Sequence, residues 1–272
     1  MAEEPPNTSP DEEAGGPVKP FLEHLEDLRW VLLKSLAVLF LGVVAAGALT
    51  RQILDWLKYP LKWAEVIPDT NQFLISTGPA EIFLAMMYIW IFGGLAFAMP
   101  FILYFIADFV LPALKSNERQ HIAPYVLGGV LLFLAGICFC FYVLLPPSLA
   151  ISYKLTVYFG MQPMWRFQQY LSFVLWLLLG MGLAFELPII LLFLVRIGIL
   201  DAKALRRGWR WGVMGCLAFS AIITPQPDPL SMFVFAAPLY ALYEISVWLA
   251  YLMEWRGRRR VAREEADEKN QR

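Results

Sequence analysis

The chain is poor in charge and in the residues that build catalytic and metal sites. Charged residues make up 17% of its 272 residues, against about 25% in a typical soluble domain. It has two histidines, and its three cysteines lie in apolar stretches without zinc-ligand spacing, so we expect no metal site. The net charge is −1 and no basic domain stands out, so nothing in the charge pattern indicates nucleic-acid binding.

The sequence also lacks the short motifs of nucleotide and peptide-bond hydrolysis. It contains no G-x-x-x-x-G-K-[ST], no H-E-x-x-H, no G-x-S-x-G and no C-x-x-C. We therefore expect neither an enzyme nor a bound cofactor. Residues 1–20 are acidic and rich in Pro and Gly, with no apolar core, which predicts a disordered tail rather than a signal peptide.

Long apolar runs are abundant, with 59% hydrophobic residues and a mean hydropathy of +0.57. Six of them predict membrane-spanning helices: Val31–Leu49, Ile82–Ala107, Ile122–Leu145, Leu171–Val195, Trp211–Ile223 and Leu230–Tyr251. We expect a kink at Pro100 and an end of the third helix at Pro146-Pro147. The fifth run would be about 20 Å long as a helix, short of the hydrocarbon core of about 30 Å, so the last two helices are expected to form a short hairpin.

Lysine and arginine are distributed unevenly between the loops. If the N-terminus is cytoplasmic, the cytoplasmic segments hold 16 of these residues and the outer loops hold 5. Cytoplasmic loops of membrane proteins carry such an excess. The sequence therefore predicts an all-α, polytopic protein with six transmembrane helices and both termini in the cytoplasm. Its six-helix membrane domain would cover residues 21–255, followed by a charged cytoplasmic tail at 256–272.

The first outer loop, Thr50 to Glu81, contains the sequence ILDWLKYPLKW. Its apolar residues follow the pattern of a short amphipathic helix at the membrane interface, interrupted at Pro60. We expect this segment to cap the outer side of the bundle.

Glu186 lies in the middle of the fourth apolar run. A charged side chain at bilayer depth costs about 2.5–3.5 kcal/mol on insertion scales, so it needs a partner or a function. Pro188 cannot donate to the carbonyl of Ala184, which predicts a kinked backbone beside the carboxyl. Two interpretations stay open: a protonated carboxyl that hydrogen-bonds to a neighbouring helix, and a polar binding spot within the membrane. Glu244 is a second acid inside a predicted span.

Two polar segments face the cytoplasm in this topology, FLEHLEDLRW at Phe21–Trp30 and LPALKSNERQH at Leu111–His121. Their acids are Glu23, Glu26, Asp27 and Glu118, the last beside Arg119. Carboxylates suit guanidinium recognition because each can form a bidentate, charge-assisted pair. A solvated charged face or internal salt bridges would give the same pattern, so the residues alone leave both explanations open.

Five motifs occur in a specific order along the chain. They are HLEDLR at His24–Arg29, LPALKSNER at Leu111–Arg119, GLAFELP at Gly182–Pro188, TPQPDPLS at Thr224–Ser231 and PLYALYE at Pro238–Glu244. In this order, and at these places relative to six spans, they resemble the TatC family, the multi-spanning receptor of the twin-arginine protein translocase. The resemblance runs from about residue 21 to about residue 260.

The resemblance implies a function in protein transport. Such a chain would bind signal peptides with a paired Arg-Arg motif and pass folded proteins outward, using the proton motive force. It would work in the cytoplasmic (inner) membrane with TatA- and TatB-type single-span partners, as a homo-oligomer within a larger complex. Its remaining contacts would be with membrane lipid and not with nucleic acid.

The resemblance also assigns site residues. Asp27 and Glu118 correspond to the twin-arginine site, and Phe109 and Arg119 match its surroundings. The family usually has Glu where this chain has Asp27, one methylene shorter, so Glu26 is the alternative contact. The residues expected to contact partners are Glu186, Pro188 and Glu244 within the membrane, and Asp228, Ser231 and Met232 at the outer hairpin. Met232 stands where the family has Gln, and TPQPDP is one residue longer than the usual TPPDP.

Two other classes of function remain open. The chain could be a proton- or ion-coupled small-solute transporter with Glu186 and Glu244 as ion sites. Such transporters usually show internal repeats, and none is visible between residues 31–145 and 171–251. A structural scaffold without a substrate is the second, but it would not need matched cytoplasmic acids.

Overall fold

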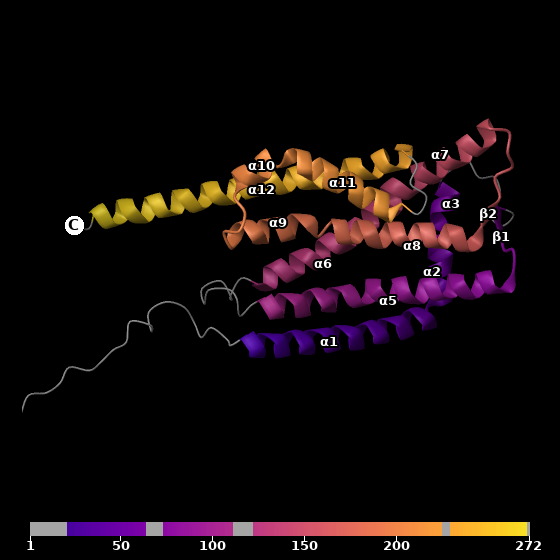
Figure 1. Cartoon of the computed structure of the whole chain (residues 1–272), viewed down its shortest axis with the longest axis horizontal. Coiled ribbons are helices and arrows are strands. Elements are labelled where there is room, and N and C mark those ends of the chain that lie inside the picture. The colour runs from indigo at the N-terminus through magenta and orange to yellow at the C-terminus, as the bar shows by residue number, and fades with distance from the viewer. Residues whose placement is uncertain (1–20, 64–72, 111–121, 225–228, 271–272) are drawn as a thin grey trace, which may run out of the picture.

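The computed structural model describes residues 21–63, 73–110, 122–224 and 229–270, which form a bundle of helices with a two-stranded sheet at one end (Figure 1). The helices are α1 (Phe21–Ala48), α2 (Thr50–Leu57), α3 (Tyr59–Trp63), α5 (Pro79–Val110), α6 (Ile122–Phe139), α7 (Leu145–Tyr158), α8 (Phe167–Ala184), α9 (Leu187–Arg196), α10 (Ala202–Arg207), α11 (Trp209–Ile223) and α12 (Pro229–Asn270). The strands are β1 (Leu74–Ile75) and β2 (Trp165–Arg166).

Among the described residues, five helical stretches are long and apolar enough to cross a membrane. They are Leu25–Ala48, Pro79–Phe109, Val126–Tyr158, Phe167–Arg196 and Met232–Arg256. With α11 as a shorter sixth apolar helix of 15 residues, they confirm the predicted all-α, multi-span fold. The predicted sixth span lies inside α12, which is not short as a whole: it runs for 42 residues and continues through the charged segment to Asn270.

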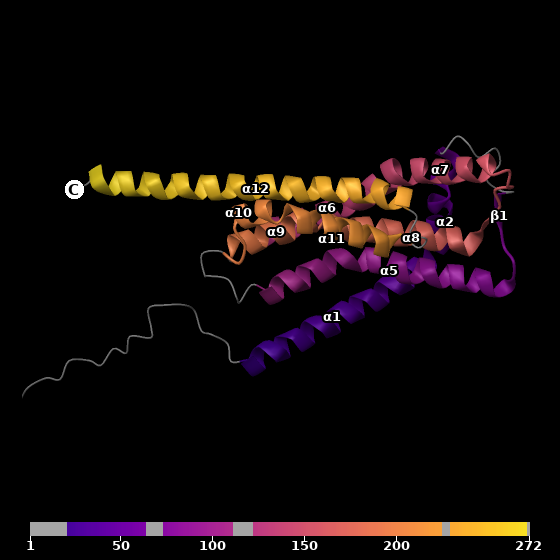
Figure 2. The same ribbon diagram turned by 45° about the horizontal axis from the view of Figure 1, so that its top comes forward.

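The helices begin and end at two opposite ends of the bundle. α1 begins, α5 ends, α6 begins and α12 ends at one end, here called the terminal end (Figure 1). The small helices α2 and α3 and the strands lie towards the opposite end, and a view turned by 45° shows the same arrangement (Figure 2). Both the start of α1 and the end of α12 therefore lie on one side of the bundle.

α1 packs mainly against α5, along a contact made by glycines. A Cβ built on Gly94 of α5 would lie 2.6 Å from the backbone nitrogen of Val43 on α1, so only glycine permits this approach. The other sides of α1 are apolar and exposed, with Leu32, Leu36 and Phe40 all more than 60% accessible. An apolar surface of this extent suits contact with lipid or a partner rather than water.

α8 is the central helix of the bundle. Most of its residues are buried, and it packs against α5 and α6. Close glycine contacts permit this packing, since Gly182 of α8 lies against the ring of Phe133 on α6 and Gly180 lies against Ile223 on α11. The core thus forms around the helix whose end at Ala184 is followed closely by Glu186.

The third apolar run does not end at its prolines, so the predicted end at Pro146-Pro147 is wrong. A π-helical turn, Cys140–Leu144, follows α6, and the chain continues as α7 with both prolines in its first turn. The missing proline N–H groups cost little in a first turn, and the wider π turn accommodates the change. This helical run consequently extends to Tyr158.

The predicted amphipathic cap exists as α2 and α3. The break between them falls at Lys58 rather than at Pro60, which lies buried inside α3. Trp56 stacks on Phe141 of the π turn with ring centroids 4.0 Å apart. Tyr170 of α8 donates a 2.6 Å hydrogen bond to the carbonyl of Leu57. The cap is therefore tied to the bundle and does not merely lie on a membrane surface.

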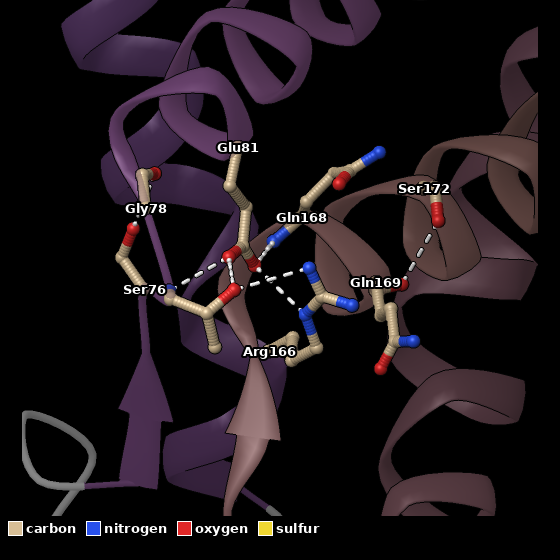
Figure 3. A network of polar contacts seen from close by, with 8 residues as sticks. Ser76, Gly78, Glu81, Arg166, Gln168, Gln169 and Ser172 are labelled. Atoms are coloured by element: carbon tan, nitrogen blue, oxygen red, sulfur yellow. Dashed lines mark hydrogen bonds and ion pairs between the residues drawn. The ribbon is translucent and has the colours of Figure 1, made fainter.

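A polar network joins the two loops at the end opposite the terminal end. The carboxylate of Glu81 accepts hydrogen bonds from the backbone and hydroxyl of Thr77, at 2.8 and 2.7 Å, and from the backbone N–H of Gln168 at 3.3 Å. Figure 3 shows Glu81 facing Arg166 and Gln168 in this network. Arg166 lies 3.6 Å from the same carboxylate and donates to the Thr77 hydroxyl. The network stands beside the parallel pairing of β1 with β2, so it fixes the start of α5 against the start of α8.

Candidate functional site

The acids predicted to recognise arginine lie at the terminal end, in the first turns of α1. Glu26 is exposed and Asp27 is half-buried. Successive residues of a helix point about 100° apart, so the two side chains cannot present the same geometry to one ligand. Asp27 is the one turned towards neighbouring structure.

α5 ends at the same end of the bundle. Phe109, in its last turn, is half-buried, and the end of α5 lies at the terminal end together with the start of α1 (Figure 1). Glu118 and Arg119 belong to the segment between α5 and α6 and lie outside the described residues. The described part of the site therefore brings Glu26, Asp27 and Phe109 to one end of the bundle, and the chain to Glu118 leaves from the same end.

Glu186 lies at a break between two helices. α8 ends at Ala184 and α9 begins at Leu187, and the N–H of Glu186 donates to the carbonyl of Leu183 in a tight turn. Pro188 is buried in the first turn of α9, where its missing N–H is tolerated. The backbone irregularity predicted from Pro188 is thus present as a break in the helix at Phe185–Glu186, just before the proline.

The carboxyl of Glu186 is buried against α6. The residue is 5% exposed, and its Oε1 is buried with no hydrogen-bond partner among the described residues. Its Oε2 lies 3.0 Å from the point where a Cβ on Gly129 would stand. The structural interpretation, a carboxyl held by hydrogen bonds to a neighbouring helix, therefore does not account for Oε1. A buried polar oxygen without a partner is costly and calls for an explanation.

Glu244 has partners, unlike the Oε1 atom of Glu186. Arg206 of α10 donates a 2.6 Å hydrogen bond to its carboxylate, and Tyr240 donates another at 2.7 Å. A second contact joins the same helices, since the hydroxyl of Tyr243 donates to the carbonyl of Leu205. Glu244 thus takes part in fixing α10 on α12.

The junction between α11 and α12 is held by hydroxyl groups. Ser220 of α11 donates to the carbonyl of Met232 at 2.8 Å, and Thr224 donates to the carbonyl of Ser220. Met232 is half-buried. Asp228 lies outside the described residues, and Ser231 belongs to α12 although its side chain is not described. Of the three predicted contact residues here, only Met232 has a described side chain.

Three features were not foreseen from the sequence: the Glu81–Arg166 network, the pairing of Glu244 with Arg206, and the closeness of Gly129 to Glu186. Glu81 and Arg166 are 85 positions apart, and no local pattern links them. A glycine in the interior of an apolar helix is a weak signal that another group approaches closely. Within the described part of the chain, no cluster of His, Cys, Asp and Glu could hold a metal ion.

The chain is similar to known proteins over most of its length. The family model "Sec-independent protein translocase protein (TatC)" matches residues 23–238. The chain is 36% identical over 233 residues to TatC of Deinococcus radiodurans, covering 85% of each chain. It is 34% identical to TatC of Koribacter versatilis, covering 91% of this chain and 90% of that one. A crystal structure of the twin-arginine translocase receptor TatC in DDM matches with a TM-score of 0.75 and 31% identity, covering 84% of this chain and 99% of that chain.

Proposed function

The chain belongs to the TatC family of Sec-independent protein translocase proteins, and from this premise we propose that it is the receptor subunit that binds twin-arginine signal peptides. It is a multi-pass membrane protein and a component of a protein translocase, not an enzyme. In the proposal its membrane is the cytoplasmic (inner) one. The membrane domain at residues 21–255 lies between two cytoplasmic tails, and the terminal end of the bundle faces the cytoplasm.

The observation that carries the proposal is that α1 begins and α5 ends at the same, terminal end of the bundle. The acids of α1 therefore lie at the end from which the chain leaves α5 towards Glu118 (Figure 1). Carboxylates from two segments can each take one guanidinium of an Arg-Arg pair, by charge-assisted hydrogen bonds. We assign Asp27 and Glu118 this role, with Glu26 as the alternative to Asp27 and with Phe109 and Arg119 beside them.

The proposal also includes docking of the single-span partners of TatA and TatB type. The carboxyl of Glu186 has a buried, unpaired Oε1 beside the break before Pro188, and it would provide a hydrogen-bonding group to a partner helix when the side chain turns towards it. Such bonds within membranes are worth about 0.6–2 kcal/mol, which suits a reversible contact. Folded cargo would then be exported by the assembled homo-oligomer and its partners at the expense of the proton motive force.

An ion-coupled transporter is less well supported by the geometry. That alternative needs both Glu186 and Glu244 as ion sites. Glu244 already forms an ion pair with Arg206 and a hydrogen bond with Tyr240, at a helix junction. Only Glu186 would be left for the ion, without a second acid.

Photocrosslinking of a twin-arginine signal peptide in membranes tests the signal-peptide site. Loss of one charge-assisted contact should cost about 1.5–3 kcal/mol, which is a loss of about ten- to over a hundred-fold in affinity. We expect Glu118→Gln and Asp27→Asn each to reduce crosslinking while the protein still inserts and folds. Glu26→Gln distinguishes the two candidates on α1. Crosslinking that stays unchanged in both Glu118→Gln and Asp27→Asn would place the site elsewhere.

A further inference from the structure

α6 has a gap in its side-chain surface where the carboxyl of Glu186 lies. Gly129 is buried, and the three atoms nearest to the position of a Cβ on it all belong to the carboxyl of Glu186: Oε2 at 3.0 Å, Oε1 at 3.6 Å and Cδ at 3.7 Å. The neighbouring Gly128 is different, since a Cβ there would meet only the flexible end of Ile189 at 3.3 Å. The gap at Gly129 is therefore filled by this one carboxyl.

The glycine at this position lowers the stability of α6, and packing alone does not explain why it is there. Glycine in the interior of a helix is destabilising relative to alanine. Glu186, whose carboxyl fills the gap, is 5% exposed, and its Oε1 atom gains no hydrogen bond from any described residue. A purely structural contact would be expected to satisfy this oxygen. The arrangement is instead that of a buried polar group held in place with Oε1 unpaired.

We propose that Gly129 is a positioning residue for Glu186. The missing Cβ lets the carboxyl rest against α6 in a fixed place, with Oε1 buried and unpaired, from which the side chain turns to meet a polar side chain of an incoming membrane helix. The complementary group is a hydroxyl or a carboxamide, because either can donate a hydrogen bond to Oε1, or accept one from Oε1 when the carboxyl is protonated, without bringing a second charge into the membrane. This inference rests on the proposed docking function of Glu186, and it adds the residue that fixes the position of the Glu186 carboxyl.

Alanine at position 129 has a defined consequence. Its Cβ would stand at 3.0 Å from Oε2, closer than ordinary van der Waals contact, so the carboxyl must shift away from α6 by a few tenths of an ångström. We expect this shift to loosen the contact that shields the carboxyl and so to raise its reactivity. The change is small in volume, so the helix itself should remain intact.

The first test follows the carboxyl directly. The full-length protein, in lipid, is treated with a hydrophobic carbodiimide, and modification of Glu186 is followed by mass spectrometry. We expect Gly129→Ala to be labelled several-fold faster than the parent, Gly128→Ala to be little changed, and Glu186→Gln to give no label at this position. Equal labelling rates for the parent and Gly129→Ala would overturn the proposal, whether or not Glu186 docks a partner.

The second test compares melting temperatures in two backgrounds. Gly129→Ala should lower the melting temperature of the parent, because the new methyl group meets the carboxyl. In a Glu186→Ala background the same change should raise it or leave it unaltered, since the space is empty and alanine favours the helix. Gly215→Ala is the control, because no atom lies within 4 Å of its Cβ position. The same shift from Gly129→Ala in both backgrounds would contradict the proposal.

Crosslinking to the single-span partner then separates this inference from the docking function. If Gly129→Ala changes labelling and also weakens crosslinking, both stand. A second outcome is that Gly129→Ala changes labelling while both Gly129→Ala and Glu186→Ala still crosslink to the partner. In that case Glu186 does not dock the partner, and the role assigned to Gly129 is wrong as well. If Glu186→Ala abolishes crosslinking but Gly129→Ala leaves crosslinking intact, docking stands and positioning by Gly129 is wrong.

Discussion

At the scale of single residues, two acids from apolar runs have opposite surroundings. Glu186 is buried at a helix break with Oε1 unpaired, whereas Glu244 is paired with Arg206. The sequence placed both in membrane spans but could not distinguish them. The partner of Glu244 comes from α10, and its contact depends on how α10 folds back on α12, which no local pattern specifies.

Substitution of Glu186 separates hydrogen bonding from ionisation. Glu186→Gln keeps both a donor and an acceptor, so it should retain much of the transport activity. Glu186→Ala removes both and should lose transport and partner crosslinking while still binding the signal peptide. The measurement is export of a folded reporter in cells that contain the variant as the sole copy. Normal export in Glu186→Ala would reduce the residue to a structural one, and complete loss in both variants would indicate an essential ionisation.

Arg206→Ala tests the structural role of the second acid. The Arg206 side chain is 57% exposed and that of Glu244 is 25% exposed, so the pair should stabilise the protein by at most about 1 kcal/mol. We expect a small drop in melting temperature and nearly normal export. A severe export defect with an unchanged melting temperature would instead give this pair a direct role in transport.

At the scale of elements, α1 is held to the bundle mainly by α5, and the contact depends on glycine. The acids of α1 are correctly placed only if this pairing is kept. Gly94→Ala would bring a methyl group to 2.6 Å from the backbone of Val43, so α1 must shift. Overpacking of this kind costs about 1–3 kcal/mol.

We therefore expect Gly94→Ala to weaken signal-peptide binding although no acid is changed. Gly47→Ala is the matched control on the same helix pair, because its Cβ would lie 3.9 Å from the ring of Trp90, an ordinary contact distance. The measurement is crosslinking of the peptide in the two variants at equal amounts of inserted protein. Equal crosslinking in both would show that the position of α1 is not set by this contact.

The sequence predicted the apolar elements well and their interruptions less well. All six runs correspond to helices, because hydrophobic length is a local property. Prolines were ambiguous, since Pro188 marks a real break whereas Pro146 and Pro147 lie inside a continuing helical run. The difference comes from the π turn that precedes Pro146, and such a turn is stabilised by packing, here against the rings of Trp56 and Trp63.

At the scale of the whole molecule, the fold places the start of α1 and the end of α12 on one side, and the excess of Lys and Arg favours that side as cytoplasmic (Figure 1). Single cysteines in a Cys-free background test this orientation. Those at Asn71 and Gln162 should react with an impermeant thiol reagent from outside, and one at Ser116 should not. Labelling of Ser116 from outside would reverse the orientation and with it the proposed site.

The central claim, that the terminal end of this bundle recognises a pair of arginines, is tested most directly by peptide binding. The purified full-length protein is incubated with an immobilised twin-arginine signal peptide or with a twin-lysine control of the same length and charge. Lysine cannot form the bidentate pair that arginine forms with a carboxylate, so we predict retention on the arginine peptide and at least ten-fold weaker binding to the lysine peptide, about 1.4 kcal/mol. Equal binding to the two peptides would contradict the claim.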